Sequence, residues 1–72
     1  MKNGFTEVIY VVSAIKDDQS EFWAAAAPRR AAAVEVQQLL PPGWTATLLG
    51  WRLGRVRAAE LKMPPDSVRR LT

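Results

Sequence analysis

The densest run of β-branched and apolar residues lies near the start of the chain and predicts a strand over residues 6–16. Apolar residues occupy both alternating sets of this run. One face would carry Val8, Tyr10, Val12 and Ala14, and the other Ile9, Val11, Ser13 and Ile15. A strand that is apolar on both faces is expected to lie centrally in its sheet or to be covered on both sides.

A polar break at residues 17–20 is typical of a hairpin connection. Phe22 and Trp23 follow it directly and favour a returning strand over residues 21–26, against the helix preference of the alanines in that segment. Pro28 disfavours helical geometry at the residue before it and suits the first position of a helix. We therefore expect the strand to end before Pro28 and a helix to begin there.

Helical periodicity is clearest over residues 28–40. The apolar positions that recur with this period form one stripe: Ala32, Ala33, Val36, Leu39 and Leu40. This face, with Val36, Leu39 and Leu40, is predicted to be buried against the sheet. Two prolines and a glycine follow and end the helix.

Alternating residues predict a third strand over residues 44–53, in which Gly50 indicates a bulge. Trp44 and Trp51 would lie on opposite faces of a regular strand, and a bulge would bring them to the same face. A short helix is expected from residue 55 to about residue 62. Its apolar face would consist of Val56, Ala59 and Met63.

The order β-β-α-β-α predicts a two-layer α+β fold, with a small, mainly antiparallel sheet of three strands, one main helix packed on it and a short C-terminal helix. A length of 72 residues allows a single domain over residues 1–72 with a thin stability margin. The chain has no Cys and no His, so neither disulfides nor a typical zinc site can stabilise it. We therefore expect a homodimer, formed through an exposed Trp or an edge strand.

The composition also bears on localisation. The absence of Cys fits a reducing compartment, and the apolar run from Val8 to Ile15 is far shorter than the ~18–20 residues of a transmembrane helix. Glu7 stands where the apolar core of a signal peptide would begin. Arg outnumbers Lys and Ala is abundant, as in proteins of high-GC bacteria. We expect a bacterial cytoplasmic protein that does not bind membranes.

The inventory of reactive side chains favours a protein that is not an enzyme. A serine nucleophile needs a base, usually His, and His is absent. Asp17 and Asp18 are neighbours in a predicted turn, where acidic residues are common for conformational reasons. Gly50 and Gly54 lack the spacing and the following Lys-Ser/Thr of a phosphate-binding loop. We predict no catalytic residues, no cofactor, no metal and no small-molecule ligand.

Positive charge is concentrated in the last third of the chain. Residues 52–72 hold six basic and two acidic side chains, whereas residues 1–51 hold four basic and five acidic ones. A basic surface attracts phosphates, although a net charge of +3 is also ordinary for a small soluble domain. Exposed Trp beside Arg suits protein interfaces and stacked bases alike. The candidate interaction surface consists of Trp23, Trp44, Trp51, Arg52, Arg55, Arg57, Arg69 and Arg70.

Residues 58–71 resemble the helix-turn-helix of excisionase-like and MerR-like DNA-binding domains. There an Ala-Ala-x-x-Leu helix meets a short turn, and a second helix opens with a Ser or Thr cap followed by Val and Arg. The resemblance implies that Ala59 touches the second helix, that Ser67 caps a recognition helix, and that Arg69 and Arg70 face DNA.

The same segment has a simpler interpretation, a C-terminal helix and turn in which Val68 and Leu71 pack inward. The leading hypothesis from the sequence is therefore a binding or accessory domain whose partner is another protein or a second copy of the chain. The alternative is a nucleic-acid-binding accessory protein that uses the basic residues 52–72.

Overall fold

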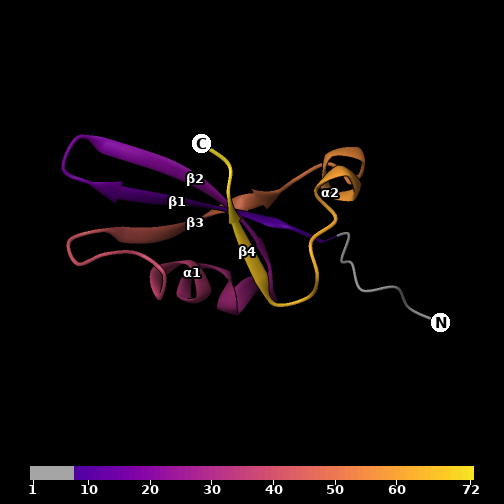
Figure 1. The fold of residues 1–72 in the computed structure, drawn as a ribbon, viewed down its shortest axis with the longest axis horizontal. Helices are drawn as coiled ribbons and strands as arrows, with labels where there is room; N and C mark the ends of the chain where they lie inside the picture. Colours follow the sequence, from indigo (N-terminus) through magenta and orange to yellow (C-terminus); the bar gives the residue numbers. More distant parts are fainter. Residues whose placement is uncertain (1–7) are drawn as a thin grey trace.

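The computed structural model describes residues 8–72, which form four strands and two helices (Figure 1). In chain order these are β1 (Tyr10–Lys16), β2 (Gln19–Ala26), α1 (Arg29–Gln37), β3 (Thr45–Arg52), α2 (Arg55–Leu61) and β4 (Ser67–Arg70). The strands make one sheet in the order β3-β1-β2-β4, and every pair in it is antiparallel. The predicted α+β class, the mainly antiparallel sheet and the central place of the first strand are confirmed.

The β1–β2 hairpin is tighter than the sequence predicts. Lys16 pairs with Gln19, so the turn consists of Asp17 and Asp18 alone. Asp17 adopts a φ of 53°, a left-handed conformation that a short polar side chain tolerates. β2 therefore begins two residues earlier than expected. Of the strand predicted over residues 6–16, Thr6 and Glu7 lie outside the described residues.

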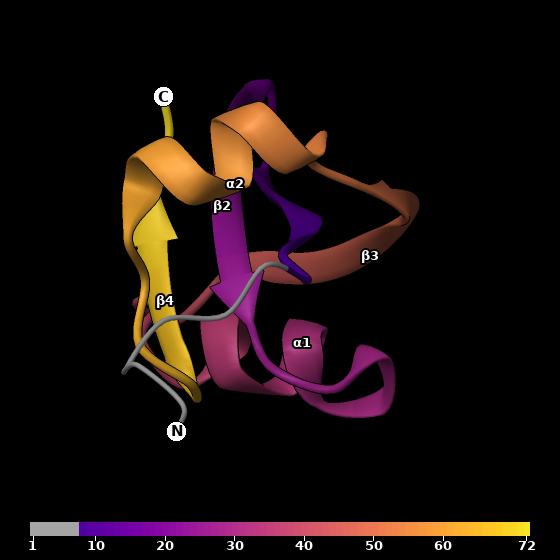
Figure 2. The same ribbon diagram turned by 90° about the vertical axis from the view of Figure 1, so that its right-hand side faces the viewer.

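The two helices lie on opposite faces of the sheet, as Figure 2 shows with α2 above the strands and α1 below them. The buried cluster under α1 consists of Val12, Ala25, Ala32 and Val36. The buried cluster under α2 consists of Ile9, Ala24, Ala26, Ala58 and Met63. Successive residues of β2 alternate between the two clusters, as the two-residue period of a strand requires. The expected two layers are thus extended by α2, which adds a partial third layer at one end of the sheet.

The main helix is shorter than the predicted helix over residues 28–40. It ends at Gln37, and Val36 is buried as expected. Leu39 was predicted to be buried, but it is 59% exposed. It lies in the turn between the helix and the following prolines, where helical spacing no longer decides which side a residue faces. Leu40 is half-buried and packs against the cluster under α1.

A fourth strand replaces the predicted C-terminal helical turn, so the expected sheet of three strands was too small by one. β4 pairs with β2 from Trp23 to Ala26. Asp66, with a φ of 64°, turns the chain into this strand, and its N–H donates to the carbonyl of Ala26 at 2.6 Å. The pairing satisfies backbone groups that a three-stranded sheet would leave open along β2.

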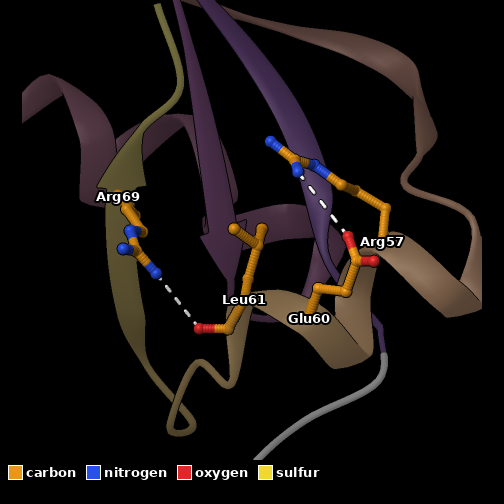
Figure 3. A network of polar contacts seen from close by, with 4 residues as sticks. All are labelled: Arg57, Glu60, Leu61 and Arg69. Atoms are coloured by element: carbon orange, nitrogen blue, oxygen red, sulfur yellow. Dashed lines mark hydrogen bonds and ion pairs between the residues drawn. The ribbon is translucent and has the colours of Figure 1, made fainter.

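The resemblance to a helix-turn-helix is wrong for this structure. Its first helix corresponds to α2, but the residues expected in the recognition helix form β4. Ser67 caps no helix, because its hydroxyl donates to the carbonyl of Pro64 at 2.6 Å. Arg69 reaches back from β4, and its Nη1 donates to the carbonyl of Leu61 at 3.1 Å (Figure 3). Within residues 8–72 no helix follows α2, and β4 stands where the recognition helix was expected.

α2 confirms the short second helix but buries a different face. Val56 and Ala59 were expected to face the core, yet Val56 is 75% exposed and Ala59 is also exposed. The buried residue is Ala58, with Leu61 half-buried beside it. Met63, which follows the helix, is buried as predicted. Both pairs have the same spacing of three residues, so periodicity cannot distinguish the two faces of so short a helix.

Candidate anion-binding site

The topology brings the start of α1 and the end of β3 to the same end of the sheet. β2 and β3 are both antiparallel to β1 and so run in the same direction, away from the β1–β2 turn. α1 begins three residues after β2 ends. Arg29, the first residue of α1, and Arg52, the last of β3, line one open hollow of about 510 Å³ together with Tyr10, Gly50 and Trp51. We call it the arginine hollow.

The arginine hollow combines cationic groups with an aromatic surface. Trp51 is 55% exposed and Tyr10 is half-buried. An exposed indole offers a flat face for stacking a ring, and guanidinium groups donate paired hydrogen bonds to phosphate or carboxylate oxygens. Trp51 is the most exposed of the three Trp residues.

A bulge in β3 positions Trp51. Tyr10 pairs with Arg52 and Val12 pairs with Leu48, so residues 49–51 of β3 lie opposite a single residue of β1. Gly50 lies inside this irregular stretch with a φ of 83°, a conformation that glycine adopts without steric cost. The bulge predicted at this glycine is confirmed, and it interrupts the regular alternation directly before Trp51.

Gly50→Ala is expected to lower the free energy of unfolding by about 1–2 kcal/mol, the cost of a left-handed conformation for an L-residue. Crowding does not contribute, because a Cβ at Gly50 would meet no atom within 4 Å. Gly54→Ala is the matched control, since the space around Gly54 is equally open and its φ is −63°. Urea denaturation measures both variants. Equal losses in both would contradict a role for the left-handed backbone at the bulge.

Two arginines of the hollow carry uncompensated charge. Neither Arg29 nor Arg52 makes an ion pair or a side-chain hydrogen bond in residues 8–72. Arg52 also borders a smaller hollow of about 190 Å³, which Val8, Leu53 and Arg55 complete. The side chains of Arg29, Arg52 and Arg55 therefore lie along one end of the sheet, between α1 and α2.

The acidic β1–β2 turn lies at the opposite end of the sheet from the arginine hollow, and Glu60 on α2 is paired. Asp17 and Asp18 lie in the turn at the other end of β1. Glu60 lies 3.7 Å from a guanidinium nitrogen of Arg57 on the exposed side of α2, and the two side chains point toward each other in Figure 3. The arginine end of the sheet is thus separated from the acidic turn by the length of β1.

The other predicted surface residues fall into separate places. Trp23 and Arg70 meet through Glu21: the indole Nε1 donates to Glu21 Oε1 at 3.2 Å, and Arg70 Nη2 lies 3.5 Å from Glu21 Oε2. Trp44 is half-buried before β3, and its carbonyl accepts a hydrogen bond from Gln37 Nε2 at 2.8 Å. Of the eight candidates, Trp51 and Arg52 therefore line the arginine hollow and Arg55 lines the smaller hollow beside it, while Trp23 and Arg70 form a separate pair.

Sequence reasoning missed Arg29 and Tyr10 as members of the site. Arg29 was counted with the slightly acidic residues 1–51, far from the basic C-terminal third. The signal that could have found it is topological. A helix that follows β2 starts at the end of the sheet where β3 finishes, provided that β3 lies beside β1.

The described part of the chain offers little for metal chemistry. Within residues 8–72, no group of three or more His, Cys, Asp or Glu could hold a metal ion. Neither described helix is long and apolar enough to cross a membrane. What the arginine hollow can do is hold an anionic group beside a stacked ring.

No family model matches the chain, no curated protein is significantly similar to it, and no solved structure matches its fold significantly. Its function has to be inferred from its own surfaces.

Proposed function

We propose that this chain is a small binding protein of the bacterial cytoplasm that holds single-stranded nucleic acid at the arginine hollow. The observation that carries the proposal is that Arg29 and Arg52, which make no ion pair within residues 8–72, line the same hollow as the exposed Trp51. Proteins that bind single strands without sequence preference combine basic grooves with aromatic side chains on which bases stack.

The role of each side chain follows from its chemistry. Arg29 and Arg52 bind phosphate oxygens, and Arg55 extends the basic track toward α2. A base stacks on Trp51, which contributes about 1–3 kcal/mol. With so few contacts, binding is weak and independent of sequence, with a dissociation constant no tighter than about micromolar at physiological salt.

A single strand fits this site better than a duplex does. Sequence-specific duplex readout generally places a helix or a β-ribbon in the major groove, and the segment expected to supply that helix is the edge strand β4. An exposed indole, by contrast, reaches the face of a base only where the bases are unstacked. The proposed activity is binding alone.

We expect a short oligothymidylate to quench Trp fluorescence, with an affinity that falls as salt rises. Two phosphates, neutralised by Arg29 and Arg52, predict a slope of about −1.4 in log K against log salt for a single strand. Arg52→Gln should reduce the slope by about 0.7, the share of one phosphate. Lys16→Gln removes the same charge beside the β1–β2 turn and should leave the slope unchanged.

A second variant tests the position of the base. In Trp51→Phe, binding measured by the anisotropy of a labelled oligonucleotide should persist while most of the quenching disappears, because Trp23 and Trp44 lie outside the hollow. Quenching that survives in Trp51→Phe would contradict this site. Nanomolar, sequence-dependent binding to a duplex would contradict the proposal as a whole.

A further inference from the structure

The sheet face under α2 is bare over the half that lies next to the β1–β2 turn. α2 stands at the other end of the sheet, and no described helix covers this face of the hairpin (Figure 1). Strand register places six residues on it: Ser13, Ile15, Ser20, Phe22, Thr45 and Thr47. Ile15 is 45% exposed and Phe22 is 42% exposed, whereas Ser13 beside them is only 6% exposed. We call these six residues the bare face.

The bare face carries no charged side chain. The opposite face of the same strands includes Lys16 and Glu21, so charge is not absent from the hairpin but sorted to one side of it. Depletion of charge around exposed aromatic and aliphatic side chains is the compositional mark of the centre of a protein interface. A surface of this kind fits another protein rather than nucleic acid.

We propose that the bare face binds the bare face of a second copy of this chain, with the strands of the two copies antiparallel. The position of α2 favours this arrangement. Because α2 rises from the same face at the far end of the sheet, two bare faces meet without a clash of helices only when each α2 lies beyond the β1–β2 turn of the other copy. A two-fold axis produces this geometry and gives both copies the same contacts.

Charge complementarity supports the second copy as the occupant. In the antiparallel arrangement, the β1–β2 turn of each copy, with Asp17 and Asp18, comes next to the α2 end of the other. That end presents Arg57 on α2 and Arg69 on β4, both exposed. Arg57 also lies 3.7 Å from Glu60, and Arg69 donates to the carbonyl of Leu61 (Figure 3), so the excess of basic over acidic side chains at this end, rather than one free guanidinium, attracts the acidic turn. The parallel arrangement would bring the two acidic turns together, which costs free energy.

Sedimentation equilibrium tests the proposal directly. The wild-type chain should be a dimer at high micromolar concentration, and Phe22→Lys should make it a monomer because a charge is then buried at the centre of the interface. Val34→Lys is the matched control, since Val34 is 53% exposed on α1, and this variant should remain a dimer. Circular dichroism shows that each variant is folded.

A second variant tests the orientation without touching the bare face. Replacing both Asp17 and Asp18 by Lys should raise the dissociation constant of the dimer by about tenfold or more, because like charges then meet at both ends. A monomeric wild-type chain, or a dimer that Val34→Lys dissolves and Phe22→Lys does not, overturns the proposal. Phe22→Lys should still quench on oligothymidylate, so failure of the dimer and failure of nucleic-acid binding are separate results.

Discussion

Ile9→Ala should lower the free energy of unfolding by about 2–5 kcal/mol, the range for truncation of a fully buried aliphatic side chain. Ile9 is fully buried and packs with Ala24, Ala58 and Met63. The alanines beside it are too short to fill the space that it leaves, and only the flexible Met63 can move into part of that space. Small domains are stable by only about 5–15 kcal/mol, so this one change could unfold much of the population. Urea denaturation followed by circular dichroism measures the loss.

Leu39→Ala is the control for this prediction. It also truncates a large aliphatic residue, but Leu39 is 59% exposed, and surface substitutions usually change stability by less than about 0.5 kcal/mol. The two variants, Ile9→Ala and Leu39→Ala, together test whether the core is the one in the structure or the one that helical periodicity predicts. A large loss in Leu39→Ala together with a small one in Ile9→Ala would mean that α2 does not close the second face of the sheet.

Features with a local cause could be predicted from the sequence. The run of β-branched residues marks β1, and Pro28 marks the boundary between β2 and α1 because its ring acts on the residues next to it. Gly50 marks the bulge for the same kind of reason, since its backbone conformation excludes most other residues. The prediction that Leu39 is buried was wrong because it extended the helical pattern past the end of the helix. The apolar stripe continues in the sequence after the helix itself has stopped at Gln37.

Features that depend on a distant partner could not be predicted. β4 is four residues long and includes two arginines, so little in it indicates a strand. It forms because β2 has an unpaired edge, which is known only once β1 and β3 are placed. The buried face of α2 has the same origin, since Ala58 packs against Ile9, almost fifty residues away in the chain.

The residues of the candidate site divide in the same way, into those with a local sequence signal and those that depend on strand pairing. Trp51, Arg52 and Arg55 are close in the sequence, and a search for basic residues beside aromatic ones finds them. Arg29 and Tyr10 join them only through the pairing of β3 with β1. The bare face was missed because both sets of alternating residues in β1 are apolar. Nothing in that pattern shows that α2 covers only half of one face.

Gln37→Ala should cost about 1–2 kcal/mol and should open one edge of the sheet to further pairing. Gln37 Nε2 donates to the carbonyl of Trp44 at 2.8 Å, and Gln37 Oε1 accepts from the N–H of Ala46 at 2.9 Å. The side-chain amide therefore binds the outer edge of β3 as a residue of a neighbouring strand would. Each of the two hydrogen bonds contributes about 0.5–1.5 kcal/mol, and the lower part of that range applies because both are exposed.

Gln38→Ala is the matched control, because Gln38 is the next residue, is exposed, and makes no side-chain hydrogen bond within residues 8–72. Its effect on unfolding in urea should stay below about 0.5 kcal/mol. The freed edge of β3 in Gln37→Ala should also promote association, as unprotected edge strands do. Association of this kind should persist when Phe22→Lys is added, because the edge of β3 is separate from the bare face. If Gln37→Ala is as stable and as little associated as Gln38→Ala, the Gln37 amide is not what protects the edge of β3. Dimerisation through that edge, which the sequence analysis expects, would then have to be tested as an alternative to the bare face.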